Sequence, residues 1–363
     1  MSNITHEVKR IKTTHLPPLP AISWDKINEE APRNIKFDYK SPNDRLPHAD
    51  IVVITWTSAE WSALDHVFAN SNETRKSYDE SWRDNWMLYS RNAMKSDFSK
   101  LWGYFRLVEI KGRRVMLFKS EAHLAHPPYI EGLTQMVQNI IDDSQPKHIY
   151  SIGTAGGSSL TEMLGDTVIT NSGHIILEKK ENENVSYNKQ TVTCNWFPSL
   201  EMQQKITDNL LMSMNQVLTP HELNHLLDRL HKEKPHSLAL TLNDLVNAPL
   251  NPQNLKQARI LPCKNIPLLT TDYYFIADGN DSSGYCTLEM DDTVVGHVAK
   301  ENQVDFTFVR NISDPIVTSE TVSGTAIPSD IRESWSSLIY ETCGFYTSFN
   351  GALTTWGCII GKS

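Results

Sequence analysis

The sequence predicts an α/β fold, because short apolar segments typical of strands alternate with segments of helical spacing. Residues 50–55 form an apolar strand candidate, and the apolar residues that follow it recur at helical spacing: Trp61, Leu64, Val67 and Phe68. A second strand is predicted over 149–152, and a third over 305–309, after a short helix over 293–300. Open α/β sheets bind ligands outside the carboxyl ends of their strands, so the residues after these strands are the candidate site.

The first helix carries an acidic residue in its first turn. Ser58 is the predicted N-cap, which places Glu60 near the positive end of the helix dipole. Taken alone, an acid at this position is more often a cap than a catalytic group.

A glycine-rich turn follows the second strand, with the sequence Gly-Thr-Ala-Gly-Gly over 153–157. Glycines at such a turn permit positive φ angles and let a ligand approach the backbone closely. The spacing is not the G-x-G-x-x-G of dinucleotide folds, and another strand is predicted just after 165–166. Such a turn alone is more often a tight connection than a site.

Two further strand ends carry acidic residues. Residues 287–292 read Thr-Leu-Glu-Met-Asp-Asp, and 310–314 read Arg-Asn-Ile-Ser-Asp. Carboxylates delivered to one sheet edge by two strands indicate a site for a hydroxylated substrate and acid–base chemistry. A solvated loop with ordinary surface acids is the alternative, and these residues alone do not decide between the two.

Together, the segments 153–157, 165–168, 288–291 and 310–314 resemble, in order, four motifs of the nucleoside phosphorylase and nucleosidase superfamily. The resemblance covers about residue 51 to the C-terminus, with one large interruption. It implies a single three-layer domain, in which helices flank a central mixed, partly barrel-like sheet. It also implies cleavage of a purine N-glycosidic bond without a cofactor, in a homodimer or homohexamer.

The resemblance assigns catalytic roles to three residues. Glu60 would activate the attacking water, Arg310 would help to hold it, and Asp314 would protonate the departing base. A carboxyl group can act as an acid near neutral pH only if burial or a hydrogen bond raises its pKa. We therefore expect Asp314 to be buried.

The resemblance also assigns residues to substrate binding. They are Thr154, Ala155, Gly156, Tyr274, Phe275, Glu289, Met290 and Asp291. Tyr274 and Phe275 would form the wall for the base, and Asp291 would bind the sugar hydroxyls. Most relatives carry glutamate where Asp291 stands, so either the backbone approaches more closely, or Asp292 shares the work, or the ribose is held less tightly.

Water is the expected nucleophile. Hexameric phosphorylases of the superfamily carry arginines for phosphate after the first strand and before the glycine-rich turn, and this chain has none at either place. A phosphorylase remains the first alternative. The second alternative is a catalytically silent nucleotide sensor. The aspartate at 291 in place of glutamate and the large interruption are compatible with it.

A nucleotide substrate is a further hypothesis. The third strand is surrounded by basic residues that could attract a 5′-phosphate, joined by two histidines just beyond it: Arg106, Lys111, Arg113, Arg114, Lys119, His123 and His126. Such a pattern more often indicates a solvated hairpin with scattered charge. Some members of the superfamily destroy AMP or ATP, the latter as anti-phage effectors.

Composition excludes several other classes. A net charge of −9 and a pI near 5.8 argue against a nucleic-acid binder, and no apolar run approaches the roughly 20 residues of a membrane span. The polar N-terminus does not predict a signal peptide, so we expect a cytoplasmic protein. The five scattered cysteines and the His123/His126 pair predict neither disulfides nor a metal site.

Outside the core, residues 1–49 are predicted to form an extended N-terminal arm, and 50–363 the catalytic domain. An insertion of about residues 178–267 interrupts this domain, with helical spacing over 200–217 and 221–230. A closing helix is predicted over 330–349.

Overall fold

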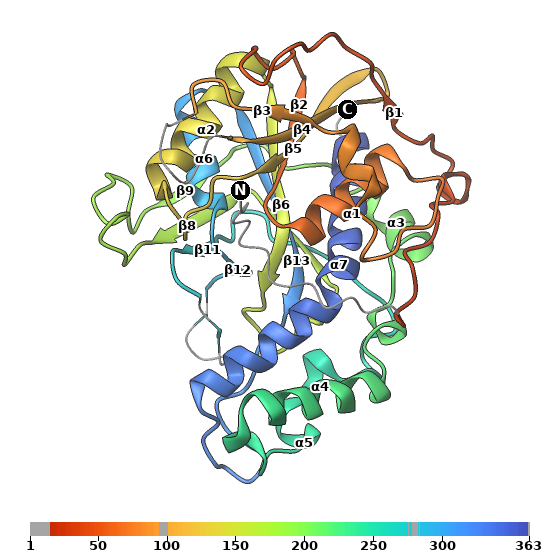
Figure 1. Ribbon diagram of the computed structural model, residues 1–363, viewed down its shortest axis with the longest axis vertical. Helices are drawn as coiled ribbons and strands as arrows, with labels where there is room; N and C mark the ends of the chain where they lie inside the picture. Colours follow the sequence, from red (N-terminus) through yellow and green to blue (C-terminus); the bar gives the residue numbers. More distant parts are fainter. Residues whose placement is uncertain (1–14, 94–100, 275, 278–281, 283, 362–363) are drawn as a thin grey trace.

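The strands of this protein join into one mixed sheet that separates two layers of helices (Figure 1). A computed structural model describes residues 15–93, 101–274, 276–277, 282 and 284–361. Helix α1 packs against α7 on one side of the sheet, and α2 packs against α6 on the other. The predicted three-layer α/β fold with a central mixed sheet is confirmed.

The strands of the described residues are β1 (Arg33–Asn34), β2 (Ile51–Thr55), β3 (Met87–Tyr89), β4 (Gly103–Ile110), β5 (Arg113–Ser120), β6 (His148–Gly156), β7 (Thr167–Thr170), β8 (Ser172–Ile176), β9 (Thr191–Thr193), β10 (Ile260–Pro262), β11 (Leu268–Thr271), β12 (Leu288–Glu289) and β13 (Asp305–Asp314). The α-helices are α1 (Ser58–Ala69), α2 (Tyr129–Ser144), α3 (Gln203–Asn209), α4 (Pro220–Glu233), α5 (Leu242–Leu245), α6 (Asp292–Glu301) and α7 (Ser329–Ile360). The 3-10 helices are η1 (Trp24–Ile27), η2 (Ser81–Asn85), η3 (Met214–Gln216), η4 (Pro235–Ser237) and η5 (Ala248–Leu250).

Strand β2 shows why the sheet needs a helical layer on each face. Ile51 and Val53 belong to the apolar core on the α1/α7 side, whereas Val52 and Ile54 belong to the core on the α2/α6 side. Successive side chains of a strand point to opposite faces, so a strand without polar alternation must be covered twice. β2 lies between β5 and β6 and runs parallel to both.

Part of the sheet closes on itself. β6 pairs with β12, β12 with β11 and β11 with β8. β8 follows β7 after a single residue, β7 pairs with β13, and β13 pairs with β6. This circuit confirms the partly barrel-like sheet, and it gives β6 three neighbours in β2, β12 and β13.

Residues 15–49 lie over the α1 and β4 side of this domain. Leu19 forms a bridge with Arg75, and β1 pairs with β4. The Trp24 ring packs 4.5 Å from that of Trp356 in α7, between ring centroids.

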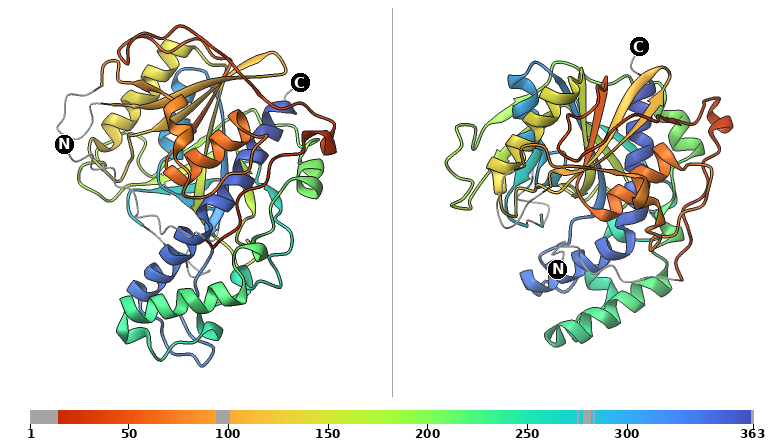
Figure 2. Two further views of the ribbon diagram at one scale, coloured as in Figure 1. Left: turned by 45° about the vertical axis from the view of Figure 1, so that its right-hand side comes forward. Right: turned by 45° about the horizontal axis from the view of Figure 1, so that its top comes forward.

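The predicted insertion is partly helical, as expected, and contains α3, α4 and α5. α4 confirms the helix expected over 221–230, but α3 ends at Asn209, well before the expected residue 217. Just beyond α3 the Asn350 side chain accepts a hydrogen bond from the Met212 amide (2.8 Å), which holds this backbone outside a helix. Figures 1 and 2 show α4 and α5 beside the first half of α7, away from the sheet.

None of the helices among the described residues combines the length and apolar character needed to cross a membrane.

Candidate active site

The structure brings most of the predicted site residues to the carboxyl end of β6. Thr154, Ala155 and Gly156 are the last residues of this strand. Glu60 reaches it from the first turn of α1, Arg310 and Asp314 come from β13, and Glu289 ends β12. The closed circuit of strands is what places these ends together.

Glu60 is buried, with 2% of its surface exposed, and its carboxylate accepts five hydrogen bonds. Oε2 accepts from the Thr55 hydroxyl and from the amides of Trp56 and Thr57 (2.8–3.1 Å). Oε1 accepts from the amide (2.8 Å) and hydroxyl (2.7 Å) of Thr154. The carboxylate therefore caps α1 and ties it to β6.

The N-cap of α1 is Thr57, which corrects the prediction of Ser58. The Thr57 side chain accepts from the Glu60 amide while Glu60 accepts from the Thr57 amide, which is a capping box. The capping role that Glu60 would have in isolation is thus present, together with its contact to Thr154.

Arg310 lies at the centre of the buried charges. Its guanidinium forms a two-pronged ion pair with Asp292, with Nε 2.7 Å from Oδ2, and contacts Glu289 Oε2 at 3.1 Å. Nη1 donates to the Thr154 carbonyl at 3.1 Å. Burial opposes the charge of this group, but the carboxylates of Asp292 and Glu289 outweigh it and raise the pKa of Arg310.

Gly153 leaves the space that these charges occupy. A Cβ at this position would lie 2.6 Å from Arg310 Nη1 and 2.8 Å from Glu60 Oε1. Any other residue would therefore push the guanidinium and the carboxylate away from β6. The glycine-rich turn serves close packing of charged groups here.

Three carboxyl groups lie at the junction of β12 and α6. Burial and the neighbouring Asp292 raise the pKa of Glu289 to about 8, and burial raises the pKa of Asp291 to about 7. Burial also raises the pKa of Asp292, although Arg310 opposes this. Glu289 contacts the Thr270 hydroxyl and accepts from the amides of Asp291 (2.6 Å) and Asp292 (2.9 Å).

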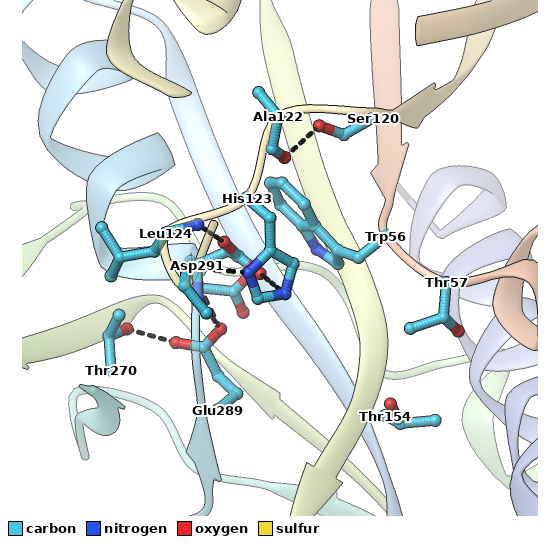
Figure 3. A network of polar contacts seen from close by, with 12 residues as sticks. Trp56, Thr57, Ser120, Ala122, His123, Leu124, Thr154, Thr270, Glu289 and Asp291 are labelled. Carbon is cyan, nitrogen blue, oxygen red and sulfur yellow. Dashed lines mark hydrogen bonds and ion pairs between the residues drawn. The ribbon is translucent and has the colours of Figure 1, made fainter. Parts of the chain in front are cut away.

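The loop after β5 covers Asp291 (Figure 3). The Leu124 amide donates to Asp291 Oδ1 at 2.9 Å, and His123 Nε2 lies 3.1 Å from Oδ2. Figure 3 shows the His123 ring between Asp291 and the indole of Trp56. Asp291, whose side chain is one methylene shorter than glutamate, is thus contacted by a loop that approaches it closely. Asp292 is instead paired with Arg310.

Asp314 ends β13 at an irregularity of the strand. The β13–β6 register shifts between Ile312 and Asp314, which pair with Ala155 and Gly156. Such a bulge redirects the side chains that follow it. The Ser313 hydroxyl donates to Asp314 Oδ1 at 2.6 Å, and the Tyr274 hydroxyl lies 3.4 Å from Oδ2. Burial of the carboxyl group raises the pKa of Asp314 to about 6 against the hydroxyl donors. The residue as a whole is partly exposed, so the expected burial is only partly met.

The remaining substrate-binding candidates differ in their placement. Ala155 is buried, whereas Gly156 and Met290 are partly exposed. Tyr274 is 46% exposed, and its hydroxyl contacts Asp314 and, at 2.8 Å, the hydroxyl of Ser336 in α7. Its polar end thus faces the candidate acid. Phe275 lies outside the described residues.

Sequence reasoning did not identify Ser313 or Ser336 as members of this site. It considered Asp292 for the sugar hydroxyls and His123 for a phosphate, not for the contacts that they make here. The serine directly before Asp314 was a visible signal for Ser313. Ser336 lies 62 positions from Tyr274 in the chain, and no local pattern indicates that pair.

The basic residues of the third strand do not form one cluster. Lys111 pairs with Glu29, Arg106 with Asp65, and Arg113 donates to a carbonyl of α7. They are distributed along the whole β4–β5 hairpin, which spans about 25 Å. Only Lys119 lies at the end of β5 near His123, and it pairs with Glu121 at 2.5 Å. Within the described ranges, no group of three or more histidines, cysteines or carboxylates could hold a metal ion.

No family model matches this chain, and no curated protein matches it. Solved structures are similar to it. One is a mutant of the Helicobacter pylori nucleosidase MTAN with 5′-methylthioadenosine in the active site; it is 8% identical, the TM-score is 0.44, and the match covers 85% of this chain and 98% of that one. Another is the futalosine hydrolase of Helicobacter pylori, at 8% identity and a TM-score of 0.43, with 84% and 97% covered.

A third is a putative 5′-methylthioadenosine/S-adenosylhomocysteine nucleosidase from Borrelia burgdorferi bound to adenine. It is 13% identical, the TM-score is 0.44, and the match covers 85% of this chain and 99% of that one. At these identities and TM-scores the matches do not bear on activity.

Proposed function

We propose that this protein hydrolyses the N-glycosidic bond of a purine nucleoside or nucleotide and releases the free base. The observation that carries the proposal is the position of two carboxyl groups at the end of one strand. Glu60 is bonded to Thr154, and Asp314 Oδ2 lies 3.4 Å from the point where a Cβ on Gly156 would stand. These contact points are two residues apart, or about 7 Å of strand. The two carboxyl groups therefore meet neighbouring positions of one strand end, and an inverting glycosidase likewise holds an acid and a base with room for a water molecule between them.

The chemistry needs one neutral and one charged carboxyl group. The Asp314 proton passes to the purine ring as the C1′–N bond breaks and its electron pair moves to the base. Water attacks C1′ from the opposite face, and its proton passes to Glu60. Burial of Asp314 supports the first role because it raises the pKa of this group to about 6. Each positioned acid or base typically contributes about 10²–10⁴-fold to the rate.

Glu60 must release a donor before it can accept a proton from water, because five donors exceed the roughly four lone-pair positions of a carboxylate. The Thr154 hydroxyl is the candidate. It can rotate without moving the backbone, and its residue is partly exposed. Rotation would let the hydroxyl and Oε1 hold one water molecule between them, near Arg310.

A catalytically silent nucleotide sensor is the second candidate function. The fully engaged Glu60 carboxylate favours it, since a cap that never releases its donors cannot serve as a base. This alternative keeps the binding roles of Met290, Asp291 and Tyr274 and removes the chemistry.

Phosphorolysis is the less favoured reaction. A phosphate nucleophile needs net positive charge, whereas the Arg310 guanidinium is neutralised by Asp292 and Glu289. The buried Glu60 carboxylate would also repel phosphate. Adenine as the base, and ATP depletion against phage, are finer forms of the proposal that depend on the substrate.

The test is to incubate the purified protein with adenosine, AMP, ATP and methylthioadenosine, with and without phosphate, and to separate the products by chromatography. We expect free base from at least one substrate without phosphate, and one ¹⁸O atom in the released sugar when the solvent is H₂¹⁸O. Release that requires phosphate and yields a sugar phosphate would establish the phosphorylase instead. Binding in calorimetry without release of base would establish the sensor.

A further inference from the structure

His123 has a fixed hydrogen-bonding arrangement at the edge of the site. Its Nδ1 lies 3.0 Å from the Ala125 amide nitrogen, and its Nε2 lies 3.1 Å from Asp291 Oδ2 (Figure 3). A backbone amide can only donate, so Nδ1 must be the unprotonated acceptor. The proton of the neutral ring is therefore on Nε2, where it donates to Asp291.

The surroundings keep this ring neutral. The pKa of His123 is lowered to about 4, chiefly by burial; Lys119, Arg310 and Lys179 act in the same direction, and Glu60 opposes them. A second proton on Nδ1 would also face the Ala125 amide proton. The ring is thus locked in one tautomer and orientation.

Asp291 keeps acceptor capacity toward a ligand. Oδ1 accepts one hydrogen bond, from the Leu124 amide, and Oδ2 accepts one, from His123, among the described residues. A carboxylate oxygen has two lone pairs, so each oxygen retains one. Asp292 cannot share this work because Arg310 and the Ser151 hydroxyl occupy it.

We propose that His123 is a positioning residue that holds the Asp291 carboxylate in place to accept a hydrogen bond from a sugar hydroxyl. The inference rests on the proposed function, since it assigns the sugar end of the same site. Asp291 is one methylene shorter than the glutamate that most relatives carry, and the imidazole holds this shorter side chain in position. The loop residues from His123 to Ala125 hold the imidazole in place. The imidazole and the Leu124 amide in turn hold the Asp291 carboxylate, which selects a ribose over a deoxyribose.

Two substitutions separate this role from a general role in folding the loop. In His123→Asn, the amide oxygen replaces Nδ1 and still accepts from the Ala125 amide, but the donor to Asp291 is lost. In His123→Gln, the amide nitrogen replaces Nε2 and still donates to Asp291, but the acceptor for Ala125 is lost. A positioning role predicts that Gln rescues and Asn does not.

The assay compares kcat/KM for adenosine with that for 2′-deoxyadenosine and 3′-deoxyadenosine. We expect His123→Asn to lower the value for adenosine about 10–100-fold, chiefly through KM, because a hydrogen bond between a carboxylate and a hydroxyl is misplaced. The analogue that lacks the recognised hydroxyl should change less than about threefold, and His123→Gln should stay within about threefold of the native enzyme. An equal loss for adenosine and both analogues, or failure of Gln to rescue, overturns the inference.

A second measurement does not depend on turnover. The Asp291 carboxyl carbon is followed by ¹³C NMR against pH, with assignment by Asp291→Asn. Asp291 also faces Arg310, Asp292 and Glu60, which are the same in both proteins. Loss of the His123 donor disfavours the charged form, so His123→Asn should raise the titration midpoint, and an unchanged midpoint overturns the pairing.

The two proposals fail separately. If no base is released, the proposed function fails, and the same comparison is made on Kd by calorimetry; an unchanged ribose-to-deoxyribose ratio in His123→Asn, or no binding of any nucleoside, then overturns this inference. If base is released with unchanged sugar selectivity, only the inference fails.

Discussion

Replacement of Asp314 by asparagine tests the proposed acid most directly. Burial raises the pKa of this carboxyl from 3.8 to about 6. At pH 7 an acid with a pKa of about 6 is about 9% protonated, whereas one with a pKa of 3.8 would be about 0.06% protonated. Burial thus increases the population of the acid form about 150-fold.

The expected kinetic result follows from this population. In the native enzyme, kcat/KM should fall about tenfold per pH unit above pH 6. Asp314→Asn should lower kcat at pH 7 by about 10²–10⁴-fold and remove this limb of the profile. The assay is release of base from the best nucleoside substrate between pH 5 and pH 9. Asp208→Asn, on the exposed side of α3, is the matched control and should behave as the native enzyme.

The same substitution should not destabilise the fold. The folded-state pKa of Asp314 lies above the unfolded value, so the neutral form stabilises the folded protein at low pH, and this contribution is lost as the pH rises from about 4 to about 6. A shift of about two units corresponds to about 3 kcal/mol, which partial exposure reduces to about 1–2 kcal/mol. Asparagine removes the charge, so urea unfolding at pH 8 should show equal or greater stability. Unchanged turnover in Asp314→Asn, or a flat profile from pH 6 to pH 9, refutes the assignment.

Two further predictions concern the partners of the catalytic pair. Tyr274→Phe removes a hydroxyl donor that favours the charged form of Asp314, so the alkaline limb of the kcat/KM profile should move upward by a few tenths of a pH unit or more; a downward shift contradicts this geometry. Glu60→Gln places an amide donor among the five donors that now converge on the carboxylate, so the free energy of unfolding should fall by about 1–3 kcal/mol and cleavage should be lost. Native-like thermal unfolding of Glu60→Gln would show that this network is not formed.

The sequence predicted the elements that carry the site, because local patterns determine them. The apolar run of β2, the glycines after β6 and the short span of α6 are each visible within about ten residues. The resemblance then placed Glu60, Thr154, Arg310 and Asp314 in one site, and β6 with its neighbours brings them together.

Features that depend on contacts between distant residues were not predictable. α7 extends to Ile360 rather than the expected residue 349, although its last third contains two glycines. Gly351 is required there because a Cβ would lie 2.6 Å from Asn311 Oδ1 of β13, so the close approach of α7 to the sheet fixes the helix. Likewise, the choice of Asp292 rather than Asp291 as the partner of Arg310 depends on where α6 begins.

The buried ion pair between Arg310 and Asp292 should contribute to the free energy of unfolding. Both side chains are almost completely buried, and removing one member of such a pair typically costs about 3–5 kcal/mol because the other charge remains unpaired. Arg310→Met should therefore lower the free energy of unfolding at pH 8 by about this amount, and the loss should shrink as the pH falls and the carboxyl groups become protonated.

The double variant Arg310→Met with Asp292→Asn should recover part of this loss, since no unpaired charge remains. Urea unfolding of both single variants and the double variant at pH 8 measures the coupling. If the effects of the single variants simply add, the pair is not coupled. Recovery of stability without recovery of cleavage would mean that the pair is not needed for folding, and that its function is to hold the guanidinium beside Thr154 and Glu60.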